Sequence, residues 1–145
     1  MGSSDSVAVL LTGVGKRYDI VSAFAQHATV VAADPNPLAP AQFAAHHRYA
    51  VPRIEDPEYV PTLRGLCDEF GVGAVVPLTD LDLEVLAVAR AAGELPAFVP
   101  DPEIARRTFD KYETHLLLSR LGLPSPPTVL PGDPVEAFPV MVKPR

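Results

Sequence analysis

The sequence has few of the features that would place it outside the class of ordinary folded domains. It has one cysteine, so no disulfide can form within the chain, and we expect a reducing, cytoplasmic setting. It has no apolar run near the roughly 18 residues that a membrane span needs. Its 12 Lys and Arg against 18 Asp and Glu give a net charge of −6, which disfavours nucleic acid and anionic membrane surfaces as partners.

Composition and the N-terminal residues favour a folded chain without a signal peptide. Apolar residues make up 48% of the 145, and a chain of about 150 residues can bury about 70% of its unfolded surface, enough for a core. Met1–Ser6 lacks the basic region of a signal peptide. Gly2 and Ser6 match the spacing of a myristoylation signal, but no basic cluster or second anchor accompanies them.

Short apolar runs alternate with segments of helical spacing through the first hundred residues. Because strands buried on both faces read as continuous apolar runs, the pattern predicts strands at 7–12, 29–33, 49–51, 74–78 and 97–99. Helices are predicted at 18–26, 40–45, 57–70 and 79–92, with Asp56-Pro57 and Thr79 with Asp82 as starts and Gly71 as a left-handed stop. This alternation specifies an α/β fold, an open parallel sheet with helices on both faces.

The character of the chain changes near residue 108. Asp101-Pro102 is a second Asp-Pro helix start like Asp56-Pro57. Asp110 with Glu113 resembles a capping box before a leucine-rich helix that ends at Gly122. Six of the 18 residues from 122 to 139 are proline, which leaves little freedom for helix. Strands are predicted at 129–130 and 140–142 around a turn at 131–134. We expect this tail to be the opening of a second domain, since a strand needs a partner.

The loop after the first strand permits two phosphate-binding interpretations, and neither matches well. A Walker loop fails, because Leu10 and Arg17 stand where it needs glycine and Ser or Thr. A dinucleotide fingerprint would use Gly13 and Gly15, but Tyr18 stands in place of its third glycine. The glycines also suit a tight turn between strand and helix.

Ligands of open α/β sheets bind beyond the carboxyl ends of strands where the strand order reverses. If the first and fourth predicted strands flank that point, two loops face each other across a crevice. Acidic side chains there could bind a cation or a substrate ammonium. Acidic residues in the first turn of a helix are also common without any ligand, because they interact favourably with the helix dipole. The candidate crevice residues are Gly13, Gly15, Asp34, Thr79, Asp80 and Asp82.

The histidines and the cysteine do not predict a metal site or a reactive thiol. His46 and His47 are adjacent, so their side chains diverge, and the other two histidines have no partner at a ligand spacing. Cys67 occupies an apolar position of its predicted helix, which favours packing. Two lysines instead stand against local preference: Lys111 at a helix start and Lys143 at the end of an apolar run. Exposed surface positions would explain both equally well.

Several segments, in order, resemble the ATP-grasp superfamily, with the closest likeness to ligases related to the carbamoyl phosphate synthetase large subunit. The segments are 34–37 (DPNP), 49–52 (YAVP), 74–80 (AVVPLTD), 109–114 (FDKYET), 121–128 (LGLPSPPT) and 138–145 (FPVMVKPR). The resemblance implies that residues 1–108 form a Rossmann-like pre-ATP-grasp domain and that residues 109–145 begin an ATP-grasp lobe. It also implies that Lys111 and Lys143 contact the phosphates of ATP, and it assigns no catalytic residue.

The resemblance further implies an ATP-dependent ligase, cytoplasmic, that uses Mg²⁺, forms an acyl phosphate and lets an amine or similar nucleophile attack it. The glycine-rich loop expected after Arg145 and the magnesium-binding lobe are missing, so we expect an N-terminal piece of a longer enzyme, inactive alone and without a tightly bound cofactor. Its partners would be ATP, a small-molecule substrate and, for residues beyond about 109, a second copy of the chain. The alternatives are a stand-alone Rossmann-like module that binds a small ligand and a dinucleotide-dependent oxidoreductase.

Overall fold

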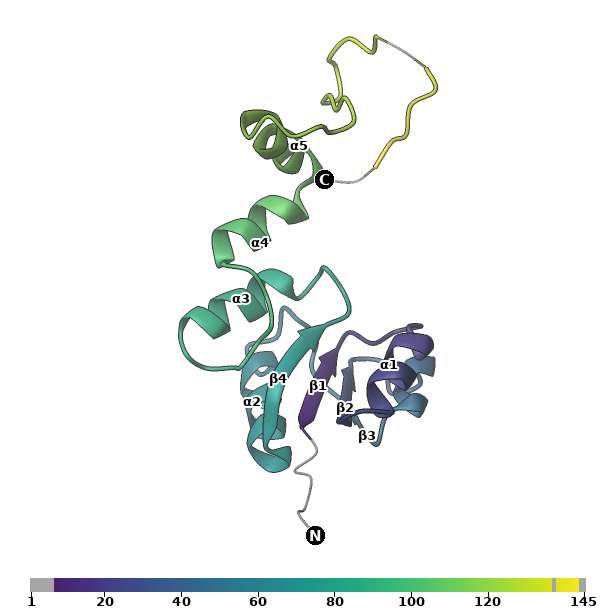
Figure 1. Ribbon diagram of the computed structural model, residues 1–145, viewed down its shortest axis with the longest axis vertical. Coiled ribbons are helices and arrows are strands. Elements are labelled where there is room, and N and C mark those ends of the chain that lie inside the picture. Colours follow the sequence, from purple (N-terminus) through teal and green to yellow (C-terminus); the bar gives the residue numbers. More distant parts are fainter. Residues whose placement is uncertain (1–6, 137, 144–145) are drawn as a thin grey trace. The chain divides into compact units, whose positions relative to one another are not determined.

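A parallel four-stranded sheet forms the centre of the first part of the chain in the computed structural model, which describes residues 7–136 and 138–143. The strands are β1 (Ala8–Thr12), β2 (Thr29–Asp34), β3 (His47–Ala50) and β4 (Val72–Pro77), in the order β3-β2-β1-β4 (Figure 1). All three pairings are parallel. The α/β class and the parallel sheet predicted from the sequence are therefore confirmed.

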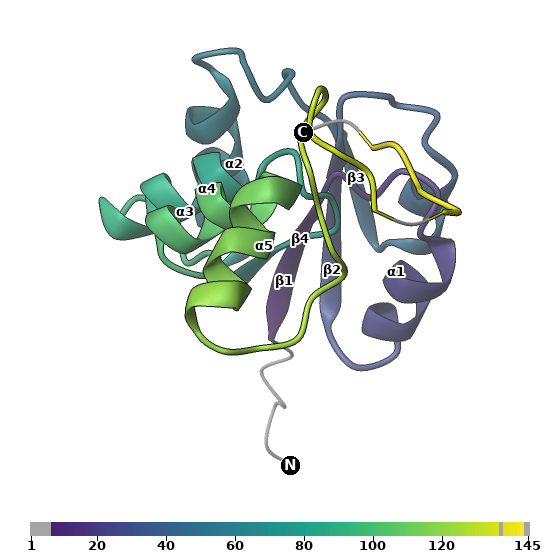
Figure 2. The ribbon, with the colours of Figure 1, turned by 90° about the horizontal axis from the view of Figure 1, so that it is seen from above.

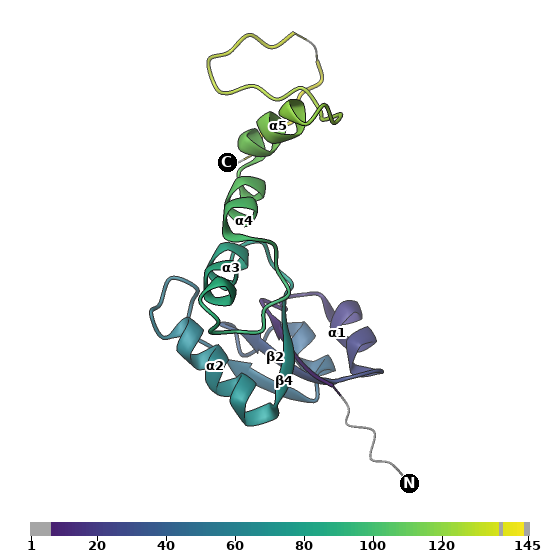
Figure 3. The same ribbon diagram turned by 60° about the vertical axis from the view of Figure 1, so that its left-hand side comes forward.

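Helices cover both faces of this sheet (Figure 3). One face packs against α1 (Tyr18–Ala25) and the short 3₁₀ helix η1 (Pro40–Ala44), and the other against α2 (Tyr59–Phe70) and α3 (Leu83–Ala91). Successive residues of β1 alternate between the two cores, Leu10 on the α2–α3 side and Leu11 on the α1 side. Each is fully buried, which stabilises the fold by roughly 1.5–3 kcal/mol per side chain.

The ends of the helices show which capping predictions hold. Gly71 ends α2 in the left-handed region at φ 60°, as predicted. Asp56 Oδ1 accepts from the Glu58 N–H at 2.9 Å just before that helix. Thr79 Oγ1 accepts from the Leu81 N–H at 3.3 Å, but the predicted capping box with Asp82 is wrong. Asp82 stands at the N-cap position of α3, yet its side chain makes no capping bond because it turns into the core.

The predicted fifth strand at 97–99 is reduced to a single bridge between Val75 and Ala97. The Val75 N–H donates to the Pro96 carbonyl at 2.9 Å, and the Phe98 N–H donates to the Val75 carbonyl at 2.7 Å. Pro96 and Pro100 flank this segment, and proline has no N–H with which to extend a ladder. The prolines thus limit the pairing at the β4 edge to one residue.

A second compact unit begins at Glu103, within α4 (Pro102–Phe109), and contains α5 (Lys111–Arg120). The predicted cap is confirmed, because Asp110 Oδ1 accepts from the N–H groups of Tyr112 and Glu113 at 2.9 and 3.1 Å. The predicted domain boundary after residue 108 stays a prediction. None of the described helices is long and apolar enough to cross a membrane.

The strands predicted at 129–130 and 140–142 are wrong, since the described residues after α5 contain no strand. Met141 and Val142 are 79% and 93% exposed, so the apolar run finds neither a pairing partner nor a covered face. The turn between them does form, with the Asp133 N–H donating to the Leu130 carbonyl at 3.1 Å. A bond of 2.6 Å between His115 Nδ1 and Ser125 Oγ ties the proline-rich segment to α5.

One glycine within α2 and one just after it predict opposite effects of substitution by alanine. Gly71→Ala places a side chain at φ 60° and should destabilise the protein by about 1–2 kcal/mol. Gly65→Ala lies inside the helix with open space around the new methyl and should stabilise by about 0.5–1 kcal/mol. Urea unfolding followed by circular dichroism measures both, and equal signs would contradict the assigned end of α2.

Candidate functional site

The strand order reverses between β1 and β4, and two loops meet there at the carboxyl edge of the sheet. The chain runs from β1 outward through β2 to β3 and then returns to place β4 on the other side of β1 (Figure 2). Thr12 pairs with Pro77, and the Leu78 N–H donates to the Thr12 carbonyl at 2.9 Å. The loops that follow, residues 13–17 and 78–82, meet at the place where the sequence predicted a crevice, and we keep that name for it. Ligands of open α/β sheets bind at such a point.

Gly13 and Thr79 bring these two loops into contact. A Cβ on Gly13 would collide with Thr79 Cγ2, and the residue has φ 57°, a conformation that side chains disfavour. Its N–H donates to the Ala33 carbonyl at 2.9 Å. Glycine is therefore required here both for the close approach and for the backbone, and the structure joins two of the residues that the sequence singled out.

Asp34 holds the first loop in place. Its Oδ2 accepts from the Gly15 N–H at 2.9 Å, and its Oδ1 accepts from the Asn36 N–H at 2.8 Å. The Gln42 amide donates to the Asn36 carbonyl at 3.0 Å and, at 3.4 Å, to that of Asp34. The carboxylate is buried and occupied by backbone groups, so neither it nor the Gly15 N–H is available for the ribose or pyrophosphate of a dinucleotide. This geometry disfavours the oxidoreductase interpretation.

Asp82 is fully buried and lies next to Thr12 and Tyr59, a cluster that the sequence did not reveal. The Tyr59 hydroxyl, from α2, donates to Asp82 Oδ2 at 2.7 Å. Asp82 Oδ1 and the hydroxyl oxygen of the neighbouring Thr12 have no partner of hydrogen-bonding geometry in the described part of the chain. The one available signal was Tyr59 itself, because a tyrosine on an apolar helix face needs a partner for its hydroxyl.

Burial sets the electrostatics of this group. It raises the pKa of the Asp82 carboxyl, and the nearby Thr12 hydroxyl, although not in hydrogen-bonding geometry, and the Tyr59 hydroxyl offset only part of that rise. Burial and the negative charge of Asp82 also raise the pKa of the Tyr59 hydroxyl, which therefore stays protonated and serves as a donor. Asp82 is thus a carboxylate retained at a site where its charge is costly.

The other candidate residues are spread over different surroundings. Asp80 and Glu84 are exposed whereas Asp82 is buried, so these three acidic residues near the start of α3 do not form one cluster. Among residues 7–136 and 138–143, no group of three or more acidic, histidine or cysteine side chains is arranged to hold a metal. Cys67 is buried, and burial raises the pKa of its thiol to about 11, in agreement with the predicted packing role.

The two lysines belong to the second unit, whereas the crevice belongs to the first. Lys111 is the first residue of α5, and its Nζ donates to the Phe109 carbonyl at 3.3 Å and lies 5.4 Å from the centre of the Phe109 ring. Lys143 is exposed in a segment without regular structure. Arg145 lies outside the described residues.

One protein-family model matches most of the first unit. The model of the family described as "PylC-like, N-terminal domain" matches residues 9–95. No curated protein sequence matches the chain.

Solved structures share the fold. Glycinamide-RNase-transformylase T from Mycobacterium tuberculosis is 22% identical, with a TM-score of 0.63 over 83% of this chain and 37% of its own. N5-carboxyaminoimidazole ribonucleotide synthetase from Thermotoga maritima is 18% identical, with a TM-score of 0.64 over 83% and 32%. Pyruvate carboxylase from Rhizobium etli is 20% identical, with a TM-score of 0.57 over 82% and 13%. The chain thus spans well under half of each of these proteins, and the likeness is one of fold.

The buried carboxyl predicts a pH-dependent effect of Asp82→Asn. An asparagine carries no charge and can both accept from Tyr59 and donate to Thr12, so the variant should be about 1–3 kcal/mol more stable at neutral pH. Because folding raises the Asp82 pKa, the stability contributed by Asp82 is complete in acid below its unfolded value of about 3.9 and is lost as the pH rises through the folded value. The gain from Asp82→Asn should therefore shrink in acid.

Urea unfolding at several pH values measures this gain. Asp80→Asn, at an exposed position, is the matched control and should change stability little at any pH. A loss of stability for Asp82→Asn at neutral pH would contradict the assignment of a costly buried charge.

Proposed function

The chain belongs to the PylC-like N-terminal domain family, and we propose that it forms the N-terminal part of an ATP-grasp ligase. The observation that carries the proposal is the family match over residues 9–95, which include both loops of the crevice. The fold it shares with a synthetase, a transformylase and a carboxylase supports the same proposal. In it, residues 1–108 are the pre-ATP-grasp domain and residues 109–145 begin the ATP-grasp lobe.

The crevice is proposed to hold the small-molecule substrate. Gly13 and Thr79 fix how closely the two loops approach, and Asp34 fixes the backbone around Gly15. Asp80 is the exposed carboxylate at the rim, where it can pair with an ammonium group of a substrate. The buried residues below therefore shape the site, and the exposed ones contact the ligand.

ATP is proposed as the cosubstrate, because it supplies the phosphoryl group that turns a carboxylate into an acyl phosphate open to attack by an amine or another nucleophile. Lys111 and Lys143 suit contacts with phosphate oxygens, since an ammonium is a compact cation with three donors. A protein of similar fold, the biotin carboxylase domain of 2-oxoglutarate carboxylase from Hydrogenobacter thermophilus, forms a dimer and binds MgADP, ADP and bicarbonate. For this chain the nucleotide, the magnesium and a homodimer belong to the proposal.

The described residues do not provide every part that the proposal needs. The described residues contain no set of acidic side chains fit to hold magnesium, so we assign no metal ligand to them. Phosphoryl transfer depends on positioning and on neutralisation of phosphate charge, which two exposed lysines alone cannot supply. We therefore propose that turnover requires the remainder of the longer enzyme.

Removal of the Lys143 charge tests the role of the second unit. In the complete enzyme, Lys143→Ala should weaken MgATP binding about ten- to a hundredfold, because a charged contact with phosphate contributes about 1.5–3 kcal/mol. Isothermal titration calorimetry measures the affinity. Arg120→Ala, at an exposed position at the end of α5, is the control and should bind MgATP like the parent. Unchanged MgATP affinity of Lys143→Ala would contradict a contact between Lys143 and the phosphates. If the unsubstituted protein does not bind MgATP, the alternative of a stand-alone module that binds a small ligand is favoured.

The crevice is tested separately through substrate. In the complete enzyme, Asp80→Asn should reduce the stimulation of ADP release by amino acid substrates about tenfold while MgATP affinity stays unchanged, since only the contact with the ammonium is lost. A coupled assay of ADP release across a panel of amino acids measures it. The control is Asp68→Asn, at an exposed position of α2, and equal effects of the two variants would contradict a crevice role.

A further inference from the structure

Asp82 occupies the N-cap position of α3 without capping the helix. Aspartate is among the residues that most favour this position, because its carboxylate accepts from the first free N–H groups of a helix. Here the side chain makes no such bond, and the backbone has φ −98° and ψ 0°, whereas an N-cap residue normally has an extended backbone. The carboxylate is instead fully buried and bonded to Tyr59. The helix therefore lacks a side-chain cap that its own sequence offers.

The buried position of the Asp82 carboxylate is unfavourable in itself. Its Oδ1 has no hydrogen-bond partner among the described residues, and burial raises the pKa of the carboxyl. An outward rotation would bring the carboxylate into water and give it N–H groups at the positively polarised start of α3. The hydrogen bond from the Tyr59 hydroxyl, at 2.7 Å, opposes this rotation. Two arrangements of Asp82 thus compete, and Tyr59 selects the buried one.

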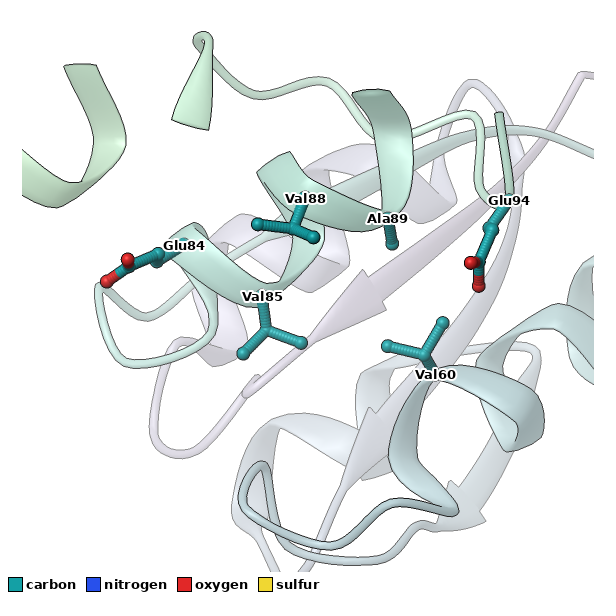
Figure 4. A pocket seen from close by; sticks show the side chains of 6 residues that line it. All are labelled: Val60, Glu84, Val85, Val88, Ala89 and Glu94. Carbon is teal, nitrogen blue, oxygen red and sulfur yellow. The ribbon is translucent and has the colours of Figure 1, made fainter. Parts of the chain in front are cut away.

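The body of α3 is fixed independently of Asp82. Val85, in the first turn of α3, packs against the core, as does Val60 of α2. Figure 4 shows Val60 directed toward the side chains of α3. Because this packing holds α3 beside α2, a change in the backbone of Asp82 displaces the loop that precedes the helix rather than the helix itself.

The exposed part of that loop, residues 78–82, lies between two anchors. At its start the Leu78 N–H donates to the Thr12 carbonyl at 2.9 Å, and at its end Asp82 is buried. Asp80 is exposed and Leu81 is 65% exposed, so the side chains between the anchors hold the loop little. To cap α3, ψ of Asp82 would have to turn from 0° to the extended region. Asp80 would move with that turn.

We propose that Asp82 is a positioning residue of the crevice, whose bond to Tyr59 holds Asp80 where it pairs with the ammonium group of the substrate. The inference rests on the proposed function, in which Asp80 makes that contact. Without the Tyr59 hydroxyl, Asp82 caps α3, the backbone before it turns, and Asp80 is misplaced. A charged contact depends on the placement of both groups, so the substrate is then bound less well.

Amide hydrogen exchange of the full chain, followed by NMR, tests the movement of Asp82. Tyr59→Phe removes the donor and leaves the carboxylate buried, so the side chain should turn outward and cap α3. Exchange of the Glu84 and Val85 amides should then slow about fivefold, the factor that corresponds to a typical capping bond. A substitution that only loosened the structure would speed exchange. The matched control is Tyr49→Phe, which removes an exposed hydroxyl on β3 and should leave both amides unchanged.

Two substitutions of Asp82 itself give an independent test. Asp82→Ser retains a good capping group that is too short to reach Tyr59, so it should slow exchange at the start of α3 as Tyr59→Phe does. Asp82→Asn keeps an acceptor for the Tyr59 hydroxyl without a charge, so it should stay buried and exchange like the parent. Unchanged or faster exchange in Tyr59→Phe or in Asp82→Ser would overturn the proposal.

Activity of the complete enzyme tests whether the movement acts through Asp80. Tyr59→Phe should reduce the stimulation of ADP release by amino acid substrates about tenfold, as Asp80→Asn does, with MgATP affinity unchanged, whereas Asp82→Asn should retain it. The double variant Tyr59→Phe/Asp80→Asn should be no worse than Asp80→Asn alone, and multiplied effects would overturn the positioning role. If Asp80→Asn changes nothing, the proposed function of the crevice fails and the role toward substrate with it, while slowed exchange would still establish the movement of Asp82.

Discussion

The parallel pairing of β1 with strands on both sides is the constraint on which the rest of the structure depends. Its five residues are buried, and they alternate between two separate cores, so β1 holds both helical layers to the sheet. The same pairing places the end of β1 beside the end of β4. The glycine loop and the Thr79 loop become neighbours for this reason, although about 65 residues separate them in the chain. Fold and candidate site thus have one cause.

Around this edge the polar side chains divide into a structural and an exposed set. Both carboxylate oxygens of Asp34 accept hydrogen bonds from backbone N–H groups, and this fixes the loop that contains Gly15. Asp82 is buried against Tyr59 with one oxygen unpartnered among the described residues, while Asp80 two positions earlier is exposed. A buried charge with an incomplete set of partners is costly and is found mostly where function retains it. The polar side chains at this edge of the sheet are therefore mostly structural, and Asp80 is the exposed carboxylate among them.

The two units differ in how far local sequence decides their structure. In the first unit, continuous apolar runs predicted β1, β2, β3 and β4, and helical spacing with capping residues predicted α1, α2 and α3, each to within a few residues. The segment at 40–45 became a 3₁₀ helix, and 97–99 made only one bridge. In the second unit the Asp110 cap was confirmed, but the strands at 129–130 and 140–142 were wrong, since a short apolar run becomes a strand only beside another strand.

The candidate site shows the same division between local and tertiary information. The sequence by itself determined the class of the fold, the glycine turn after the first strand, the helix ends at Gly71 and Asp110, and the family resemblance, because each depends on residues close together in the chain. Only the tertiary structure decided that Gly13 touches Thr79, that Asp34 is occupied by backbone, and that Tyr59 meets Asp82 across 23 residues. Such contacts depend on strand order and on which helix covers which face, and no local pattern encodes either.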